Sequence, residues 1–274
     1  MVKGEPVTEH YHRGVVAHLI GYPLALPLDL ELQGPGEGET PACARMVERA
    51  CRDYSRFFDA LSGDSLYLEA PFINRCLEQG KDVIAVLKGE HRLLLQDAEG
   101  LFRTMAPGVW QEPDRIVKWW DADGFPAEGI PRPVRILHTE ETVKRRERKA
   151  GKWVETIQTQ TWWWGTTIPQ SRLPTRALWE IGHAHWDVED DLFNDLVNHW
   201  NLDHCFTHDP TAIVNFILTL FIAFVLLQAF HQRNLKPQRR VRFTLIAIAQ
   251  ELHLGLTEAG FRAPWLLAAG ERSP

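Results

Sequence analysis

The segment Gly63-Asp64-Ser65-Leu66-Tyr67 ends an apolar run, and the elements expected on either side of it decide the fold class. These elements are, in chain order, strands over residues 11–20 and 24–32, a helix from residue 41, the strand that ends at Asp64, a helix over residues 70–79 and a buried strand over residues 82–88. This order is typical of a mixed α/β fold. Asp64 then lies at the carboxyl end of a strand, where ligands usually bind on such sheets.

A second acidic residue, Glu189, lies in the string Ile181-Gly-His-Ala-His-Trp-Asp-Val-Glu189. If residues 175–200 form one α-helix at about 100° per residue, Glu189 shares an arc with large apolar side chains. These are Trp179, Trp186, Phe193, Leu196, Val197 and Trp200. Burying a carboxylate is costly unless it is paired, protonated or bound to metal. We therefore expect Asp64 and Glu189 to be functional and to bind Mg²⁺ or Mn²⁺, which prefer oxygen ligands. A strand-end aspartate is also often only a turn or cap residue.

Composition describes an ordinary globular protein, with 45% hydrophobic and 24% charged residues and a net charge of −6. This acidic balance argues against a dedicated nucleic-acid-binding protein, but two basic runs, over residues 144–149 and 233–242, argue for DNA binding. The candidate DNA-binding residues in these runs are Lys144, Arg145, Arg146, Arg148, Arg239 and Arg240. The alternative is that each run is only a solvated face or loop.

The four cysteines form no CxxC pair and no disulfide framework, and the amino terminus is unlike a signal peptide. We therefore expect a reduced, cytoplasmic protein. The apolar stretch 213–230 is at the short end of what a bilayer needs and contains Asn215, Thr219 and Gln228. We expect it to be a buried core helix rather than a membrane span.

Residues 92–174 differ in sequence pattern from the segments on either side. Short β-like pieces alternate there with Pro- and Gly-rich turns, which predicts a β-rich insertion too long to be a plain loop. The expected organisation is a first part of the core over residues 9–91, the insertion over 92–174, a helical part of the core over 175–254 and a tail over 255–274.

Two further clusters have competing interpretations. Five histidines and Cys205 lie within residues 183–208, which suggests zinc, but their spacing matches no standard zinc template. We expect them to form hydrogen bonds near a helix end. Trp119-Trp120 and Trp162-Trp163-Trp164 could stack on bases, but they could equally fill the core of the insertion.

Several strings, taken in order, resemble bacterial insertion-sequence transposases of the "insertion sequence four"-like group, the DDE type with a β-strand insertion. They are Glu9-His-Tyr-His-Arg-Gly-Val-Val-Ala-His-Leu-Ile-Gly21, Pro35-Gly-Glu-Gly-Glu39, Asp64-Ser-Leu-Tyr67 with Ala70-Pro-Phe72, Trp186-Asp-Val-Glu189, Asn198-His-Trp-Asn-Leu-Asp-His204 and His208-Asp-Pro210. The resemblance implies a ribonuclease-H-like core. In that core three acids bind two divalent metals for attack on phosphodiesters.

In this resemblance Asp64 matches the second acid and Glu189 the third, and the insertion matches the region that helps to hold the transposon end. His185 stands where the family usually has an arginine, so it is placed with the DNA-binding residues. The implied cofactor is Mg²⁺ or Mn²⁺. The implied partners are transposon ends and target DNA, with a second copy or a full-length transposase as a protein partner.

The resemblance puts the first acid on a strand before Tyr11, where only ten residues stand. Asp29 cannot replace it. Its strand lies three positions from that of Asp64 in the implied strand order, about 14 Å, whereas paired metals lie only about 3.5–4 Å apart. We therefore expect an amino-truncated and inactive transposase with open strand edges and low stability. The alternatives are a non-catalytic DNA-binding regulator and a membrane-attached protein.

Overall fold

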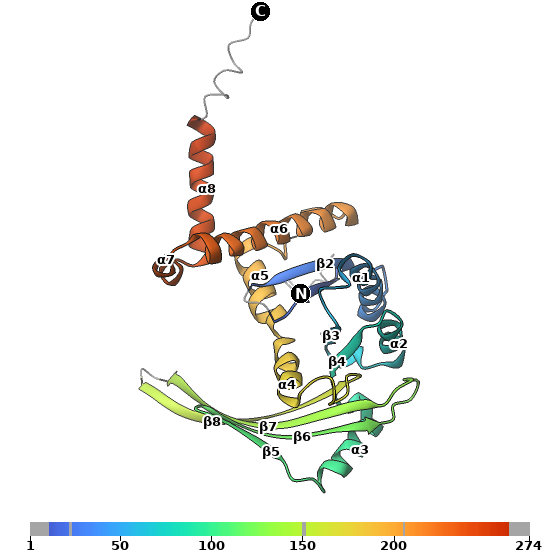
Figure 1. Cartoon of the computed structure of the whole chain (residues 1–274). Coiled ribbons are helices and arrows are strands. Elements are labelled where there is room, and N and C mark those ends of the chain that lie inside the picture. The colour runs from blue at the N-terminus through green and yellow to red at the C-terminus, as the bar shows by residue number, and fades with distance from the viewer. Residues whose placement is uncertain (1–10, 22–23, 150–151, 205, 263–274) are drawn as a thin grey trace, which may run out of the picture. The chain divides into compact units, whose positions relative to one another are not determined.

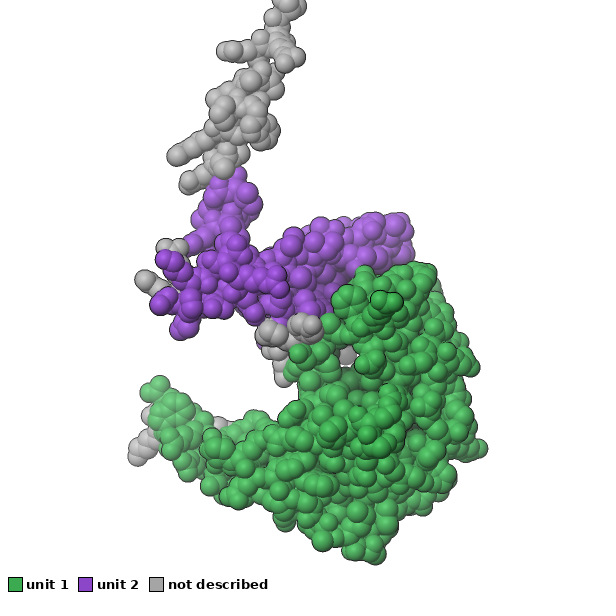
Figure 2. Space-filling model, in the orientation of Figure 1, with its two compact units in different colours: residues 1–21, 28–188 green, residues 22–27, 189–274 purple. Residues whose placement is uncertain are grey.

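The computed structural model describes residues 11–21, 24–149, 152–204 and 206–262 of the 274-residue chain. The chain forms two compact units, residues 1–21 with 28–188 and residues 22–27 with 189–274 (Figure 2). Each unit is described by itself below.

The larger unit contains a six-stranded mixed sheet in the order β3-β4-β8-β7-β6-β5 (Figure 1). Its strands are β3 (Ala60–Gly63), β4 (Asp82–Val86), β5 (Gly108–Glu112), β6 (Arg115–Phe125), β7 (Val134–Lys149) and β8 (Lys152–Thr166). Only β3 and β4 pair in parallel, and the other neighbours are antiparallel. The mixed α/β class expected from the sequence is therefore confirmed.

Helices cover both faces of this sheet, and β4 shows why its sequence is continuously apolar. All five β4 residues are buried. Val83 and Ala85 face one apolar core, and Ile84 and Val86 face another. Alternate side chains of a strand point to opposite faces, so a strand covered on both sides has no polar face. The helices of this unit are α1 (Glu39–Tyr54), α2 (Ala70–Glu78), α3 (Arg92–Phe102) and α4 (Thr175–Ala184), with 3₁₀ turns η1 (Ser65–Tyr67) and η2 (Gly89–His91).

The predicted helix over residues 70–79 is confirmed as α2, and Gly80 follows it with φ +72°. The region 92–174 begins with helix α3, which the sequence analysis did not predict, and continues with the four strands β5 to β8. β8 returns to pair with β4 through Ala85 and Gly165. The insertion therefore extends the core sheet by hydrogen bonds.

The first two strands, β1 (Gly14–Leu19) and β2 (Leu26–Leu32), form a separate two-stranded sheet. Val15 and Ala17 of β1 and Leu61 of β3 nevertheless pack against one apolar core. In the described part of the chain, β1 and β3 each pair with one strand only. Among these described residues, each therefore leaves one edge without a strand partner.

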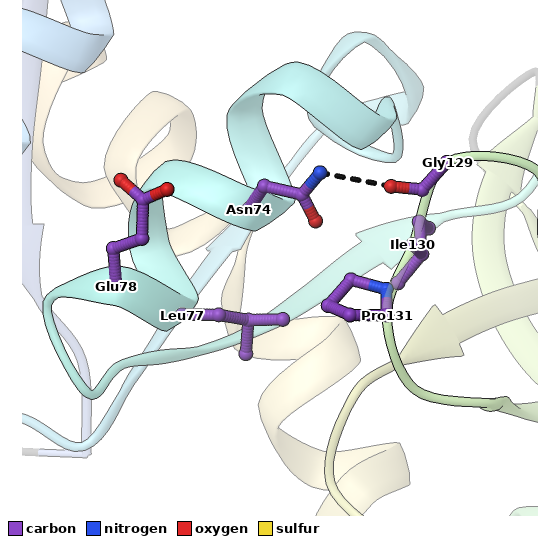
Figure 3. Close-up of a pocket in the computed structure, with 6 residues that line it drawn as sticks. All are labelled: Asn74, Leu77, Glu78, Gly129, Ile130 and Pro131. Carbon is purple, nitrogen blue, oxygen red and sulfur yellow. Dashed lines mark hydrogen bonds between the residues drawn. The ribbon is translucent and has the colours of Figure 1, made fainter.

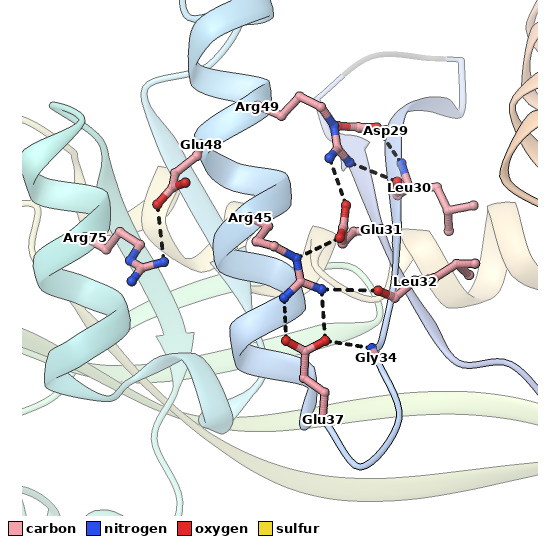
Figure 4. Close-up of polar contacts among 10 residues, drawn as sticks. All are labelled: Asp29, Leu30, Glu31, Leu32, Gly34, Glu37, Arg45, Glu48, Arg49 and Arg75. Carbon is pink, nitrogen blue, oxygen red and sulfur yellow. Dashed lines mark hydrogen bonds and ion pairs between the residues drawn. The ribbon is translucent and has the colours of Figure 1, made fainter. Parts of the chain in front are cut away.

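The alternating pattern of β2 predicts that its acids face solvent, which is wrong for Asp29. Asp29 is buried and its Oδ2 lies 2.7 Å from Arg49 Nε of α1. Arg49 Nη1 also lies 2.8 Å from Glu31, which Arg45 contacts as well (Figure 4). Helix α1 supplies two arginines to this face, so charge pairing rather than exposure accommodates the acids. Burial raises the pKa of Glu31, but the two arginines outweigh it and the pKa is lowered overall.

The helix predicted over residues 175–200 is interrupted. α4 ends at Ala184, a turn follows at His185 and Trp186, a π-helix spans Val188–Phe193, and α5 spans Asn194–Trp200. A π-helix is bonded i to i+5, so its angle per residue differs from that of an α-helix. The single arc calculated for a regular helix therefore does not continue across this segment.

The smaller unit consists mainly of α5, α6 (Pro210–Asn234), α7 (Pro237–Arg242) and α8 (Leu245–Arg262). By length and composition α6 could cross a membrane, with a mean hydropathy of 2.5. The expectation of a buried core helix is wrong, because only 22% of its apolar window is buried. Its Gln228 is buried, and its amide bonds with both the N–H and the C=O of Ala25. This pairing satisfies a polar group that a lipid-facing helix would leave unsatisfied, and it favours packing against protein.

Candidate functional site

Asp64 follows directly after β3 and occupies the position before the 3₁₀ turn η1. The backbone carbonyl of Asp64 accepts from the Tyr67 N–H at 3.0 Å, but its carboxylate makes no capping hydrogen bond. The side chain is 49% exposed, and its Oδ1 lies 3.4 Å from Nε2 of His185. The carboxylate is therefore free of the capping role that a strand-end aspartate often has.

His185 reaches Asp64 from the turn that follows α4. Helix α4 is fixed on the sheet by Leu178 and Trp179, both buried in the core that includes Ile84 and Val86. The His185 ring also lies against that of Trp186, with centroids 5.2 Å apart. The structure thus places a residue expected to contact DNA beside the expected second acid, 121 positions away in sequence.

Glu189 is exposed and lies in the π-helix Val188–Phe193. The prediction that its carboxylate lies on a buried face is wrong, because the turn and the π-helix rotate it away from the arc of a regular helix. Leu196 is buried as expected, but Val197 is exposed. Asp64 and Glu189 belong to different compact units.

A buried acid that the sequence did not reveal is Glu141 of β7, which is 1% exposed. Its Oε1 accepts from Trp179 Nε1 at 2.8 Å and from Thr139 Oγ1 at 3.1 Å, and lies 2.7 Å from His183 Nε2. Arg115 lies 3.8 Å from its other oxygen. Burial raises the pKa of Glu141, but the hydrogen bonds from His183 and Trp179 outweigh burial, so the pKa is lowered overall.

The Glu141 cluster fixes α4 to β7 and thereby positions the turn that carries His185. No local signal marks Glu141, since it lies in a polar stretch, Thr139-Glu140-Glu141-Thr142, that resembles an exposed strand. Its partners on α4 lie about 40 residues further along the chain.

The predicted basic residues of β7 lie on a long hairpin with β8. Lys144, Arg145, Arg146 and Arg148 are all exposed. Arg146 pairs with Glu155 across the hairpin at 2.9 Å, and Arg148 is opposite Trp153, which is 71% exposed. Cross-strand partners share a face of a sheet. The described end of the hairpin therefore presents cations on both faces, together with Trp153, an exposed aromatic residue that was not among the predicted contacts.

The predicted DNA-binding residues outside the hairpin, and the tryptophans considered for base stacking, lie in other parts of the chain. Arg239 lies in α7, and its side chain is outside the described part of the structure. Arg240 Nη1 donates to the Gln232 carbonyl at 3.0 Å, near the end of α6. The tryptophans at 119, 120 and 162–164 are buried or partly buried in the two cores of the sheet, as packing predicts.

The histidines between residues 183 and 208 do not share one centre. His183 contacts Glu141, His185 contacts Asp64, and His199 lies 3.9 Å from Asp195. Cys205 lies outside the described residues. Where the structure describes the chain, no three His, Cys, Asp or Glu side chains come together as a metal-binding group.

A cavity of about 500 Å³ lies between α2 and the loop over residues 126–133 (Figure 3). Asn74 Nδ2 donates to the Gly129 carbonyl across it at 2.8 Å, and Leu77, Glu78, Ile130 and Pro131 complete its lining. It offers one carboxylate and no cation among these residues. It is therefore unsuited to hold a metal pair or a phosphate.

The family model for the transposase DDE domain matches residues 2–226 of the chain. The chain belongs to the DDE transposase family. Membership implies DNA transposition, a reaction that this family typically carries out with divalent metals. No curated protein matches the chain. The matched region of this DDE-family chain includes Asp64, Glu189, the basic hairpin and most of α6.

Asp64 fits a hydrated divalent cation, because its carboxylate is half exposed and takes no part in capping. Mg²⁺ is commonly bound by one or two carboxylates and keeps several waters. Among the described residues of the larger unit, Asp64 is the carboxylate available here, and the imidazole of His185 lies beside it. A complete set of ligands for two metal ions is not present among the described residues of that unit.

Proposed function

We propose that this chain is a DNA-binding transposase of the "insertion sequence four"-like group that does not itself cleave DNA strands. The observation that carries the DNA-binding part is the β7–β8 hairpin. Its exposed cations stand on a rigid two-stranded ladder rather than in a loop. Phosphate contacts from such cations supply sequence-independent affinity that falls with salt.

In this proposal Asp64 and Glu189 are the second and third acids of the family, and each would hold Mg²⁺ or Mn²⁺. Bound metal supplies activation of water or of a DNA 3′-hydroxyl for attack on a phosphodiester. Asp64 contributes a carboxylate, and its backbone is held by the hydrogen bond from the Tyr67 N–H to the Asp64 carbonyl oxygen. The fixed position of α4 limits movement of the adjacent His185 turn.

The proposed lack of cleavage concerns the acids that the described residues offer, and Asp29 is the other candidate among them. Asp29 lies in the separate two-stranded sheet and is bound to Arg49, so it cannot complete a metal pair with Asp64. Asp64 and Glu189 by themselves do not readily hold both metals of a two-metal site. A supercoiled-plasmid nicking assay with Mg²⁺ or Mn²⁺ should show no cleavage by the chain. Cleavage that disappears in Asp64→Asn would overturn this part of the proposal.

The DNA-binding part is tested separately with the triple variant Lys144→Gln, Arg145→Gln, Arg148→Gln. The matched control is Arg52→Gln, Arg56→Gln, Arg103→Gln, which also removes three exposed cations. In a salt titration by fluorescence anisotropy, the hairpin variant should reduce the salt slope by about one unit for each phosphate that it no longer neutralises. The control triple should bind like the unmodified chain. Equal effects of the two triples would show that the hairpin is not the interface.

The open edges of β1 and β3 favour assembly with another strand-bearing protein, either a second copy or a full-length transposase. Such mixed assembly would make the chain a cytoplasmic regulator of other members of the family. Size-exclusion chromatography with light scattering tests it directly. A purely monomeric chain that does not co-elute with a full-length relative would contradict this assembly and leave DNA binding unaffected.

A further inference from the structure

The contact between His185 and Asp64 is longer than an ordinary hydrogen bond. Nε2 and Oδ1 lie 3.4 Å apart, whereas N–H···O bonds in proteins usually measure about 2.7–3.2 Å. Two donors that each lie about 2.1 Å from one octahedrally coordinated cation are about 3.0 Å apart at its 90° angle. The observed separation lies about 0.4 Å above this spacing, so a small adjustment of either side chain would bring both atoms to one ion.

The surroundings of the pair allow a cation to approach. The carboxylate is half exposed and does not cap η1, while the His185 side chain is 15% exposed and held by its turn. Among the described side chains, no lysine or arginine lies within ion-pair distance of Asp64. The charge of the carboxylate is therefore not neutralised by a fixed cation.

We infer that His185 Nε2 and Asp64 Oδ1 together bind one divalent ion and make this site select Mn²⁺ over Mg²⁺. The inference rests on the proposed function, because it concerns the metal site of the same acid. Mg²⁺ takes oxygen ligands and retains its waters. An imidazole nitrogen favours first-row transition ions, whose affinity for such sites exceeds that of Mg²⁺. An arginine at position 185 could not contribute in this way, since a guanidinium has no acceptor atom.

The test uses the purified full chain with Mn²⁺ as the only added metal. Binding is measured by electron paramagnetic resonance, and electron spin-echo envelope modulation detects an imidazole ¹⁴N bound directly to Mn²⁺. The variants are His185→Gln and Asp64→Asn. The matched control is His199→Gln, because His199 also faces an aspartate, Asp195, but at 3.9 Å.

The expected result is ¹⁴N modulation in the unmodified chain and in the His199 variant, and its loss in His185→Gln. Mn²⁺ affinity should fall at least ~10-fold in His185→Gln, and Mg²⁺ should displace Mn²⁺ more readily from that variant. Binding without ¹⁴N modulation, modulation that survives His185→Gln, or no bound Mn²⁺ at millimolar concentration would each overturn the inference. The first and third results need no variant, so a folding defect cannot obscure them.

A failure of this inference is distinguishable from a failure of the proposed function. Hairpin-dependent DNA binding is measured in EDTA, where no divalent ion is free. DNA binding without ¹⁴N modulation would remove only the metal assignment. Modulation without DNA binding would remove only the proposed function.

Discussion

Replacing Glu141 with leucine should destabilise the larger unit by about 3 kcal/mol, because buried donors lose their acceptor. One oxygen, Oε1, lies within hydrogen-bond distance of Trp179, His183 and Thr139. Trp179 is buried, so its indole N–H would lose its partner without reaching water, whereas His183 is partly exposed and recovers some hydration. A lost partner costs about 1–3 kcal/mol per buried group. Leucine offsets only part of this cost, because it also removes the buried charge of the glutamate.

The assay is urea unfolding followed by tryptophan fluorescence. All tryptophans except Trp200 and Trp265 lie in the larger unit, so the signal reports mainly on its unfolding. Glu141→Gln keeps one acceptor oxygen and should cost less than Glu141→Leu. The control is Glu155→Leu, which removes an exposed glutamate of the same hairpin and should change stability by less than about 1 kcal/mol. A Glu141→Leu variant as stable as the control would refute the view that this acid fixes α4 to the sheet.

Glu141 should also make the free energy of unfolding depend on pH in a defined direction. The pKa of Glu141 lies below its ordinary value of 4.5 in the folded chain, so folding favours its ionised form. Its contribution is therefore complete above pH 4.5 and is lost as the pH falls through the lowered folded-state pKa. The stability difference between the unmodified chain and Glu141→Gln should narrow over that acidic range. If the stability difference between the two proteins stays constant down to lower pH, the ionised form of Glu141 is not the one that folding favours.

Three further substitutions test other parts of the fold. Gly80→Ala places a Cβ at φ +72° with no neighbour within 4 Å, so only backbone strain applies, and thermal melting should show a loss of about 1–2 kcal/mol. Arg49→Met leaves buried Asp29 without its ion-pair partner, so hydrogen exchange of β1 and β2 should accelerate, and unchanged protection would contradict the pairing. Gln228→Leu removes both hydrogen bonds to Ala25 and should destabilise the smaller unit by about 1–3 kcal/mol, measured as faster amide exchange along α6.

Elements whose signal is local could be predicted from the sequence. The apolar run of β4 reflects burial on two faces, and Gly80 supplies the positive φ that ends α2. The end of an apolar run correctly predicts that Asp64 lies at a strand end. In each case the residues that determine the structure lie within the element itself or directly beside it.

Features that depend on distant partners could not be predicted in this way. Asp29 has the alternation of an exposed acid, and its burial depends on the ion pair with Arg49, twenty positions later, beside a hydrogen bond from the adjacent Leu30 N–H. Glu141 lies in a strand of polar sequence, and it is buried only because α4 covers it. The buried arc predicted for Glu189 assumes an uninterrupted α-helix, and the π-helix invalidates that assumption. Periodicity cannot reveal a change of helix type or a partner more than a few turns away.

The continuity of the sheet gives one more prediction, about the length of DNA that the larger unit covers. Gly63 pairs with Ala85, Ala85 with Gly165, and β8 then continues to Trp153, so Asp64 and the hairpin share one hydrogen-bonded ladder. Twelve residue steps separate Gly165 from Trp153, which is about 40 Å at 3.3 Å per residue. At about 3.4 Å per base pair, this length corresponds to about one helical turn of DNA.

Hydroxyl-radical footprinting at saturating protein concentration should therefore show protection extending about one turn from the Asp64 end to the hairpin end. The Lys144, Arg145 and Arg148 triple variant should lose protection at one end of that footprint only, because the ladder fixes the cations far from Asp64. A uniform loss of protection along the whole footprint would contradict a rigid separation of the two places. One-sided loss would show that the insertion, although distant in sequence from both acids, sets the spacing between the DNA-binding cations and Asp64 through the backbone ladder of the core.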